Sequence, residues 1–483
     1  EDCNANGIPD ECDIASGVAV DNDGNGIPDT CEVEPSCFEL EGLLQREALN
    51  GAGGFGFSID TAPGRVAVTA PFALFTPAAE GRGGDDPGRA YLFDVETGDQ
   101  LQVFTGEGQD ENILYGLDVD LTADTLLVGA PRFPDTDDDP GAGYLYDAVT
   151  PFNLVHLLAG PEPPPSEDDS EAGTSVAQND EWLFLGGPNW GNDQANLVGQ
   201  VYRYDRATGA LVETIVKPGQ PQLALFGDEM ALEGDILVVS EPASAGGGLV
   251  RIFDISTQPP VLLENLQLPG GQGHGTALAI QDGIIAYTAR FSPPGALAER
   301  GGGVPLGRVA LYDLNQGLEL GTVDVPGSVT SLAFSDDPCA PFLAVGAADA
   351  PSGDAFNGGR VYLIDPTDVS LTGVIDLEMP QNSEEFGRSL AFDGGRLIIG
   401  APGWEDEIDG TNEGRAYVYA CGDCFGDTCP PDLDGDGEVA TGDLLILLAN
   451  WGTSGPGADL AAPNDVVDIS DQLVLLAAWG PCP

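Results

Sequence analysis

The amino-acid sequence predicts a mainly β protein: a seven-bladed β-propeller with a small calcium-loop module at the N-terminus and a small α-helical domain at the C-terminus. Two observations lead to this prediction. A unit of four short, strand-like segments recurs seven times between about residues 51 and 420. Acidic loops with calcium-ligand spacing occur in pairs near both ends. The chain length is consistent with this architecture, because a chain of 483 residues is expected to form several modules or a repeat array rather than one compact core.

Composition limits the possible functions before any motif is considered. The chain carries 80 acidic and 16 basic residues, a net charge of −64, and Lys217 is its only lysine. Nucleic-acid recognition needs clustered Lys and Arg, so we expect no nucleic-acid partner. No run of 18 apolar residues is present, so we also expect no membrane insertion. Because no signal peptide opens the sequence, we expect that Glu1 begins a processed or truncated form.

Nine cysteines gather at the two ends of the chain, and only Cys339 lies in the long middle. Cysteines that flank small acidic modules are typical of disulfide staples in an oxidising compartment. We therefore expect a secreted protein, extracellular or on the cell surface. The odd number leaves at least one thiol free or bonded to another chain. The disulfide candidates are Cys12, Cys31, Cys37, Cys421, Cys424, Cys429 and Cys482.

Each of the seven units begins with a short signal, usually an aromatic residue followed by glycine. Successive signals are 48 to 60 residues apart, a spacing typical of a repeated supersecondary unit. The signals are Phe55-Gly56, Tyr115-Gly116, Ala172-Gly173, Phe226-Gly227, His274-Gly275, a degenerate Ser328-Val329, and Phe386-Gly387.

Three further segments complete a unit. An apolar run that ends in Gly-Ala-Pro, or in a relic of it, follows the signal, as in residues 66–71 and 126–131. An alternating aromatic segment such as Arg89–Asp94 comes next, and a last segment such as 100–105 closes most units. The runs are too short for helices and are bounded by Gly and Pro, which favours strands. Seven four-stranded units suit a propeller, whose closure protects the sheet edges.

This repeat resembles the FG-GAP repeat of integrin-α-like β-propellers over about 370 residues. The resemblance implies a seven-bladed FG-GAP-like propeller, which we place at residues 37–421. Members of the family often carry a calcium loop of the D-x-D-x-D-G kind between strands 1 and 2 of a blade. Here that connection spans only residues 60–65 or 393–396 and holds too few carboxylates. We therefore expect no calcium sites within the propeller.

Strand counting predicts how the ring closes. The seventh unit supplies three strands and then runs into Cys421, while residues 38–50 precede the first unit without a unit of their own. We expect residues 38–50 to form the closing, outer strand of the last blade. Cys37 would then lie beside Cys421, with Cys424 as the alternative partner. Such a bridge would stabilise the fold by about 4–5 kcal/mol on the chain-entropy model.

Two acidic loops follow one another within residues 1–36. One places oxygen ligands at positions 1, 3, 5, 7, 9 and 12, with Gly26 at position 6, the spacing by which a loop wraps calcium. These ligands are Asp21, Asp23, Asn25, Ile27, Asp29 and Glu32. The other loop offers Asp2, Asn4, Asn6, Ile8, Asp10 and Asp13. The pair resembles thrombospondin type 3 repeats, which implies calcium as the cofactor; the alternative is a solvated acidic turn in a flexible tail.

A second pair of loops lies in residues 430–483, after a Cys-rich linker at 422–429. A first loop and the helix after it are repeated 28 residues later, and this arrangement resembles a type I dockerin domain. The first loop offers Asp432, Asp434, Asp436, Glu438 and Asp443 as ligands. The second retains Asp459, Asn464, Asp468 and Asp471 but has Ala461, Ala462 and Pro463 at ligand positions, which puts its calcium site in doubt. A disulfide between Cys429 and Cys482 would clasp the ends of this domain.

The leucines of the two expected helices admit two interpretations. They could form the core of the small domain or a groove for a partner, and we favour the core because so short a domain needs every apolar face. The leucines in question are Leu444, Leu445, Leu447 and Leu448 in one helix, and Leu473, Leu475 and Leu476 in the other.

Catalytic interpretations find little support in the sequence. His274 takes the place of the aromatic residue in a repeat signal, and His156 lies in a strand-like run beside Leu157. No Ser or Cys nucleophile motif accompanies either, so we expect both histidines to be structural. A carboxylate pair suited to glycoside hydrolysis is compatible with 80 acidic residues, but nothing in the sequence singles one out.

Loop lengths predict where a partner would bind. In an up-and-down blade, the connections between strands 2 and 3 and between consecutive blades emerge on one face. The long, acidic or proline-rich segments are all of this kind, and elaborated loops on a rigid scaffold commonly carry binding sites. Solvated surface is the plainer interpretation of their acidic stretches. The segments are 72–88, 132–143, 161–171, 291–307 and 403–414.

These observations favour a secreted, calcium-binding, non-enzymatic adhesion or scaffold protein of the bacterial cell surface or extracellular matrix. Its partner would be a cohesin-like receptor, a glycan, or further copies of the chain in a self-assembling fibre. The alternative is a propeller enzyme or lectin that acts on extracellular polysaccharide and is anchored by the dockerin-like end.

Overall fold

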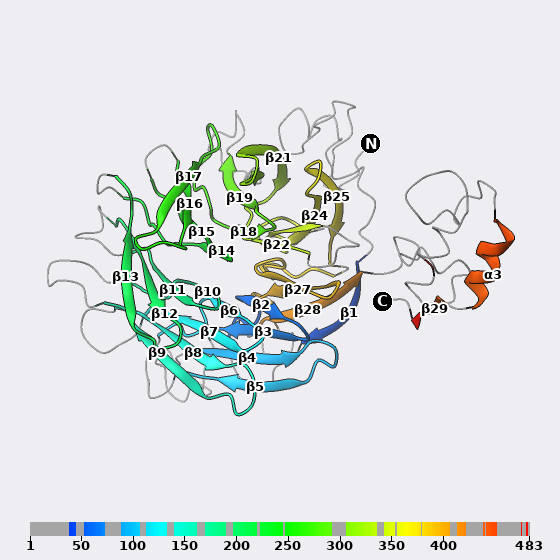
Figure 1. Ribbon diagram of the computed structural model, residues 1–483, viewed down its shortest axis with the longest axis horizontal. Coiled ribbons are helices and arrows are strands. Elements are labelled where there is room, and N and C mark those ends of the chain that lie inside the picture. Colours follow the sequence, from blue (N-terminus) through cyan, green and yellow to red (C-terminus); the bar gives the residue numbers. More distant parts are fainter. Residues whose placement is uncertain are drawn as a thin grey trace. The chain divides into compact units, whose positions relative to one another are not determined.

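The computed structural model describes most of the propeller and part of the C-terminal region (Figure 1). The chain divides into two units, Glu1–Ala420 and Cys421–Pro483. None of the helices in the described residues is long and apolar enough to cross a membrane. The described residues are 38–44, 53–72, 88–106, 113–132, 140–161, 170–189, 197–219, 223–244, 247–291, 306–335, 342–352, 355–377, 379–421 except 406–412, 438–439, 441–451, 475 and 480–481.

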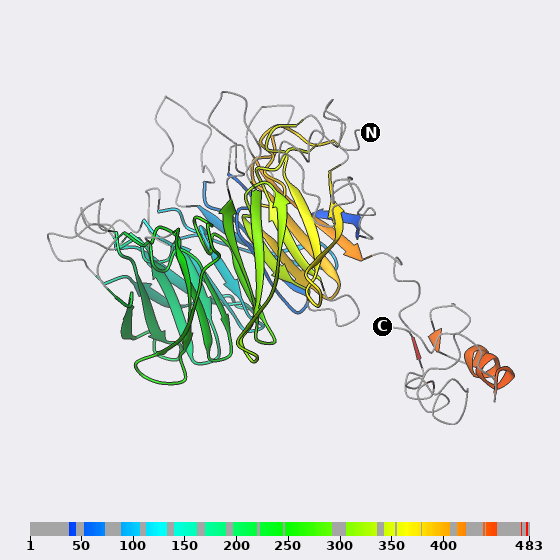
Figure 2. The ribbon, with the colours of Figure 1, turned by 90° about the horizontal axis from the view of Figure 1, so that it is seen from above.

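Seven four-stranded antiparallel sheets are arranged radially around a common axis (Figures 1 and 2), which confirms the mainly β, seven-bladed propeller. From the innermost to the outermost strand, blade I contains β2 (Ile59–Ala62), β3 (Arg65–Ala70), β4 (Arg89–Asp94) and β5 (Gln100–Phe104). Blade II contains β6 (Val119–Leu121), β7 (Thr125–Ala130), β8 (Ala142–Asp147) and β9 (Leu154–Ala159). Blade III contains β10 (Ser175–Gln178), β11 (Trp182–Gly187), β12 (Gln200–Asp205) and β13 (Leu211–Val216).

The other four blades follow the same order. Blade IV contains β14 (Met230–Glu233), β15 (Ile236–Glu241), β16 (Leu249–Asp254) and β17 (Val261–Leu266). Blade V contains β18 (Leu278–Gln281), β19 (Ile284–Phe291), β20 (Leu306–Asp313) and β21 (Leu318–Pro326). Blade VI contains β22 (Ser331–Phe334), β23 (Leu343–Ala347), β24 (Arg360–Asp365) and β25 (Ser370–Ile375). Blade VII contains β26 (Leu390–Asp393), β27 (Arg396–Ala401), β28 (Arg415–Cys421) and β1 (Phe38–Leu44).

Burial follows the position of each strand within its blade. All six residues of the second strand β7 are buried, whereas in the outer strand β9 exposed residues alternate with half-buried ones and with the buried Leu158. The second strand packs between neighbouring blades on both faces, so it needs a continuous apolar run rather than an alternating one. The prolines that end these runs, such as Pro71 and Pro131, lie just outside the strands because proline has no N–H for the ladder.

The strand β1 completes the last blade from the other end of the chain. It lies at the outer edge beside β28, the position that strand counting predicts for this segment. Phe38 and Leu44 are buried, and the Phe38 ring meets those of Phe342 and Phe392 edge-on at 6.2 Å each. Residues 45–50 of the expected strand, and Cys37, lie outside the described residues.

The aromatic-glycine signals form the joints between blades. Gly88, which leads into β4, forms a parallel bridge with Tyr115 of the next blade, and its φ of +92° is a backbone conformation that favours glycine. A Cβ atom at Gly88 would stand 2.2 Å from the carbonyl oxygen of Tyr115, so no other residue fits there. Within blade II, the N–H of Gly116 donates to the carbonyl of Gly129 at 2.8 Å. The signal therefore recurs because each joint needs this close backbone approach.

The C-terminal unit contains one described helix, α3 (Thr441–Ala449), and a short antiparallel pair. This pair, β29 (Glu438–Val439) and β30 (Gly480–Pro481), joins the segment just before α3 to the end of the unit. Leu447 and Leu475 are fully buried, in agreement with a core role. For Leu445 and Leu448 that expectation is wrong, since they are 68% and 47% exposed. The helical period of 3.6 residues places them away from the face that buries Leu447.

Candidate binding cavity on the propeller axis

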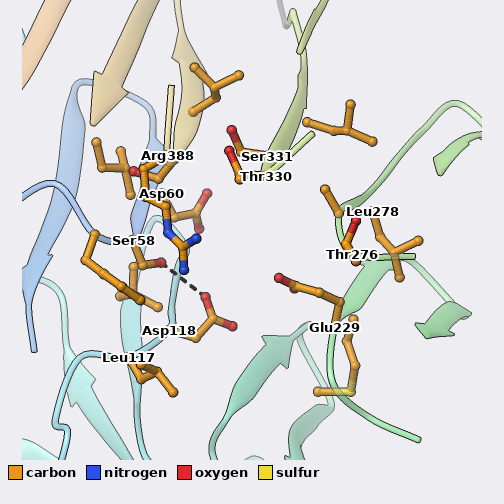
Figure 3. Close-up of a pocket in the computed structure, with 18 of the residues that line it drawn as sticks. Ser58, Asp60, Leu117, Asp118, Glu229, Thr276, Leu278, Thr330, Ser331 and Arg388 are labelled. Atoms are coloured by element: carbon orange, nitrogen blue, oxygen red, sulfur yellow. Dashed lines mark hydrogen bonds between the residues drawn. The ribbon is translucent and has the colours of Figure 1, made fainter. Parts of the chain in front are cut away.

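A cavity of about 480 Å³ lies where the innermost strands converge on the axis. It is lined by the first residues of these strands and by the turns that lead into them (Figure 3). The volume falls within the range of roughly 300–1,000 Å³ that is typical of small-molecule sites. Because every blade contributes equivalent positions, the lining can be compared blade by blade.

The residue directly after each signal forms one ring of the lining. In chain order this ring contains Phe57, Leu117, Thr174, Asp228, Thr276, Thr330 and Arg388. Within this ring, Asp228 and Arg388 are the charged members. The ring is therefore asymmetric, with apolar groups in blades I and II, hydroxyl groups in blades III, V and VI, and charges in blades IV and VII.

The residue that follows the ring residue in each blade shows what the joint between blades requires. Serine occupies this position in four blades, and three of these serines join neighbouring blades through their hydroxyl groups. Ser175 donates to the carbonyl oxygen of Gly227 at 2.8 Å, Ser331 to that of Gly387 at 2.8 Å, and Ser389 to that of Gly56 at 2.9 Å. A serine thus satisfies the blade joint, and a carboxylate at this position exceeds what the joint needs.

Four carboxylates depart from the residues that most blades have at two equivalent positions. Asp118 and Glu229 stand at the position where other blades have serine or, in blade V, Ala277. Asp60 and Asp120 lie two residues further along their strands. The five other blades have alanine there: Ala177, Ala231, Ala279, Ala333 and Ala391. The comparison between blades therefore marks these carboxylates as departures from the blade repeat that line this cavity.

Three of the carboxylates also hold the next blade in register. Asp60 accepts the backbone N–H of Leu121 at 2.6 Å, and Asp120 accepts that of Gln178 at 3.0 Å. Asp118 accepts the N–H of Val176 at 2.8 Å on one oxygen and the Ser58 hydroxyl at 3.1 Å on the other, a contact visible in Figure 3. These bonds connect blade I with blade II and blade II with blade III.

The acids of blade IV have a different environment. Asp228 and Glu229 border the cavity, and among the described residues no hydrogen bond to either carboxyl group is observed. Figure 3 shows Glu229 and Arg388 reaching toward the middle of the cavity from different sides. The Arg388 guanidinium lies over the Phe57 ring, 4.6 Å from its centre. An acid, a guanidinium and an aromatic ring therefore converge on one space.

Burial raises the pKa values of the carboxyl groups that line the cavity. Desolvation raises the pKa of Asp118 to about 6, that of Asp120 to about 7 and that of Asp228 to about 6, although backbone N–H donors oppose the shift at Asp118 and Asp120. Desolvation, reinforced by neighbouring carboxylates, raises the pKa values of Asp60 and Glu229 well above their usual range. At neutral pH the cavity therefore presents both protonated and ionised carboxyl groups, that is, both donors and acceptors.

The two histidines lie away from the cavity lining. His274 is fully buried, its Nδ1 lies 2.8 Å from the carbonyl oxygen of Gly247, and its Nε2 accepts the N–H of Leu268 at 2.8 Å. The Nε2 of half-buried His156 lies 3.1 Å from the carbonyl oxygen of Arg206. Both are engaged with backbone groups, the structural role that we expect for them.

Most of the predicted calcium ligands lie outside the described residues. This holds for the sites at 2–13 and 21–32, for Asp432, Asp434 and Asp436, and for Asp459, Asn464 and Asp471. Glu438 belongs to β29 and Asp443 to α3, and their side chains also lie outside the described part. In the described ranges, no three His, Cys, Asp or Glu side chains lie close enough to hold a metal ion. Most of each elaborated loop is likewise outside these ranges.

The residues that line the cavity were not among those predicted from the sequence. The signal was present, since Asp60 and Asp120 interrupt a column of five alanines and Glu229 interrupts a column of serines. The sequence alone does not show that the side chains at these positions face the propeller axis. It also does not show that Arg388 and Glu229 reach into the same cavity from different sides (Figure 3).

Comparison with known proteins agrees with the fold. Residues 380–419, which contain β26, β27 and the beginning of β28, match the FG-GAP repeat. The match covers part of one blade, and together with the seven observed blades it supports an FG-GAP propeller. A comparison with curated proteins finds no match.

Proposed function

We propose that the chain is a secreted, calcium-binding adhesion or scaffold protein of the bacterial cell surface or extracellular matrix, without a catalytic role. The observation that carries this proposal is the axial cavity, an asymmetric polar recess on a rigid seven-bladed scaffold. Its convergent donors and acceptors suit ligand binding. A nucleophile paired with a histidine is not part of its lining, because both histidines are bonded elsewhere.

The two ends of the chain would connect this scaffold to its surroundings. Loops with calcium-ligand spacing gather carboxylates that repel one another without the ion, so calcium would order both ends. At a net charge of −64, association between copies would also require bridging cations. The partner of the dockerin-like end would be a cohesin-like receptor or another copy of the chain in a filament.

Light scattering of the full chain in millimolar calcium, before and after chelation, tests this role. Reversible growth of particles with calcium supports the scaffold, and calcium-dependent capture by an immobilised cohesin module supports anchoring. A chain that stays monomeric, binds no cohesin and shows the same hydrogen exchange at its ends with and without calcium would contradict the proposal.

One observation favours a second candidate, an enzyme that acts on extracellular polysaccharide. Glu229 has a strongly raised pKa, and Asp118 lies in the same cavity as a hydrogen-bonded carboxyl group. A protonated acid beside a carboxylate is the combination that glycoside hydrolysis uses. Release of reducing ends from polysaccharides by the native chain, abolished in Glu229→Gln, would favour this candidate. Absence of such release leaves binding as the function of the cavity.

A further inference from the structure

We propose that the axial cavity binds a single uncharged sugar unit, such as the end of a neutral polysaccharide chain. This inference deepens the adhesion role and rests on it, because it names what the propeller would hold. It is carried by the composition of the lining and by the way in which that composition departs from the blade repeat.

The lining offers what a sugar needs on every side. Sugars present many hydroxyl groups that both donate and accept, together with patches of C–H groups. The cavity provides Thr276 and Thr330 as hydroxyl partners, Glu229 and Asp228 as carboxyl partners, and Arg388 as a donor. Leucine residues at 117, 278 and 390 supply apolar surface between them. This mixture matches a polyhydroxylated ligand better than a purely apolar one.

A metal ion fits this lining less well. Calcium requires six to eight oxygen ligands around one point. In the described residues no three acidic side chains converge on a common centre. Asp60, Asp118 and Asp120 already accept backbone N–H groups of the next blade, which directs some of their oxygens away from the axis.

The charges also argue against an ionic ligand. An anionic sugar would meet a surplus of carboxylates on a chain of net charge −64. A cation would compete with the guanidinium of Arg388, which already reaches into the cavity and attracts Glu229. Arg290 and Arg388 supply positive charge within the lining, and the raised pKa values of Asp60 and Glu229 reduce its negative charge, so neutral hydrogen-bonding groups match it best.

Saturation-transfer NMR and titration calorimetry on the full chain test the inference. The probes are glucose, galactose, mannose and N-acetylglucosamine as neutral sugars, glucuronate as an anion and glucosamine as a cation. We expect at least one neutral sugar to bind and glucuronate not to bind. Glu229→Gln and Arg388→Gln should each weaken binding by about tenfold, the effect of losing one hydrogen bond to the sugar.

Glu264→Gln, which changes an exposed glutamate on the outer strand β17, is the matched control and should bind as the native chain does. Thermal unfolding verifies that each variant is folded; Glu229 makes no described side-chain hydrogen bond whose loss would unfold the blade. The inference is overturned if no neutral sugar binds, if glucosamine alone binds, or if both cavity variants bind unchanged. In those cases calcium-dependent assembly or cohesin capture would still stand, so the adhesion role is judged separately.

Discussion

Glu41 in β1 and Arg396 in β27, 355 residues apart in sequence, form a two-point ion pair in the last blade. Arg396 Nε lies 2.7 Å from Glu41 Oε2, and its Nη2 lies 3.1 Å from Oε1. The side chains are 42% and 28% exposed, so solvent screens the pair and its contribution should be below about 1 kcal/mol. The pair marks where the ring closes, but apolar burial must supply most of the stabilising energy.

Phe38→Ala should therefore destabilise the propeller far more than Glu41→Gln. Phe38 is 6% exposed and contacts two other phenylalanine rings, and removal of such a side chain costs about 3–5 kcal/mol. Glu41→Gln should cost less than about 1 kcal/mol. Urea unfolding of the two variants measures both values. Equal losses would show that the ion pair, and not the apolar contact, holds β1 in place.

Gly88→Ala should cost about 2–5 kcal/mol, since it combines a left-handed backbone with a Cβ placed 2.2 Å from the Tyr115 carbonyl oxygen. Gly98→Ala is the matched control. Its φ is +72°, but a Cβ there would have nothing within 4 Å. The substitution should therefore cost only the about 1–2 kcal/mol that a left-handed backbone conformation imposes on alanine. Melting temperatures that fall equally would refute the role of close blade approach.

The stability of the propeller should fall as pH rises from about 4 to 7. The pKa values of Asp118, Asp120 and Asp228 are raised to about 6, 7 and 6, so the folded state holds more protons than the unfolded state in this range. Because the folded state binds more protons than the unfolded state, the free energy of unfolding decreases as pH rises, until these carboxyl groups have ionised. Calorimetric melting temperatures between pH 4.5 and 8 measure the slope.

Glu229→Gln and Asp228→Asn should make this slope shallower, because each removes one carboxyl group with a raised pKa. Asp254→Asn serves as the control. Hydrogen bonds from the Ser256 side chain and backbone lower the pKa of Asp254, so the substitution should not reduce the loss of stability between pH 4 and 7. An unchanged slope in the cavity variants would assign the pH effect to the net negative charge of the whole chain.

Chelation of calcium should loosen residues 1–36 and 430–483 while it leaves the propeller protected. The predicted ligands lie in those two segments, and the blades are held by apolar clusters and backbone ladders. Hydrogen exchange followed by mass spectrometry resolves the segments in one experiment. Uniform loosening, or no change at either end, would contradict the prediction.

Much of the fold was predictable because its determinants are local. The strand Arg89–Asp94 has the bounds that its alternating pattern predicts, and the apolar run at 126–131 forms β7 without its final proline. In the C-terminal unit, only part of the leucine-rich run that was predicted to form the core is buried. Leu447 is buried but Leu445 is not, since a run of leucines does not state which helix face meets a neighbour.

By itself the sequence determined the period, the number of blades and the strand that closes the ring, because each depends on spacing along the chain and on residues that only certain backbone geometries accept. The tertiary structure alone decided which side chains share the axial cavity. Asp118, Glu229 and Arg388 lie in three different blades and come together only when the ring closes. The pKa values of the two acids depend on that closure, since desolvation and the nearness of other charges do not exist in an open chain.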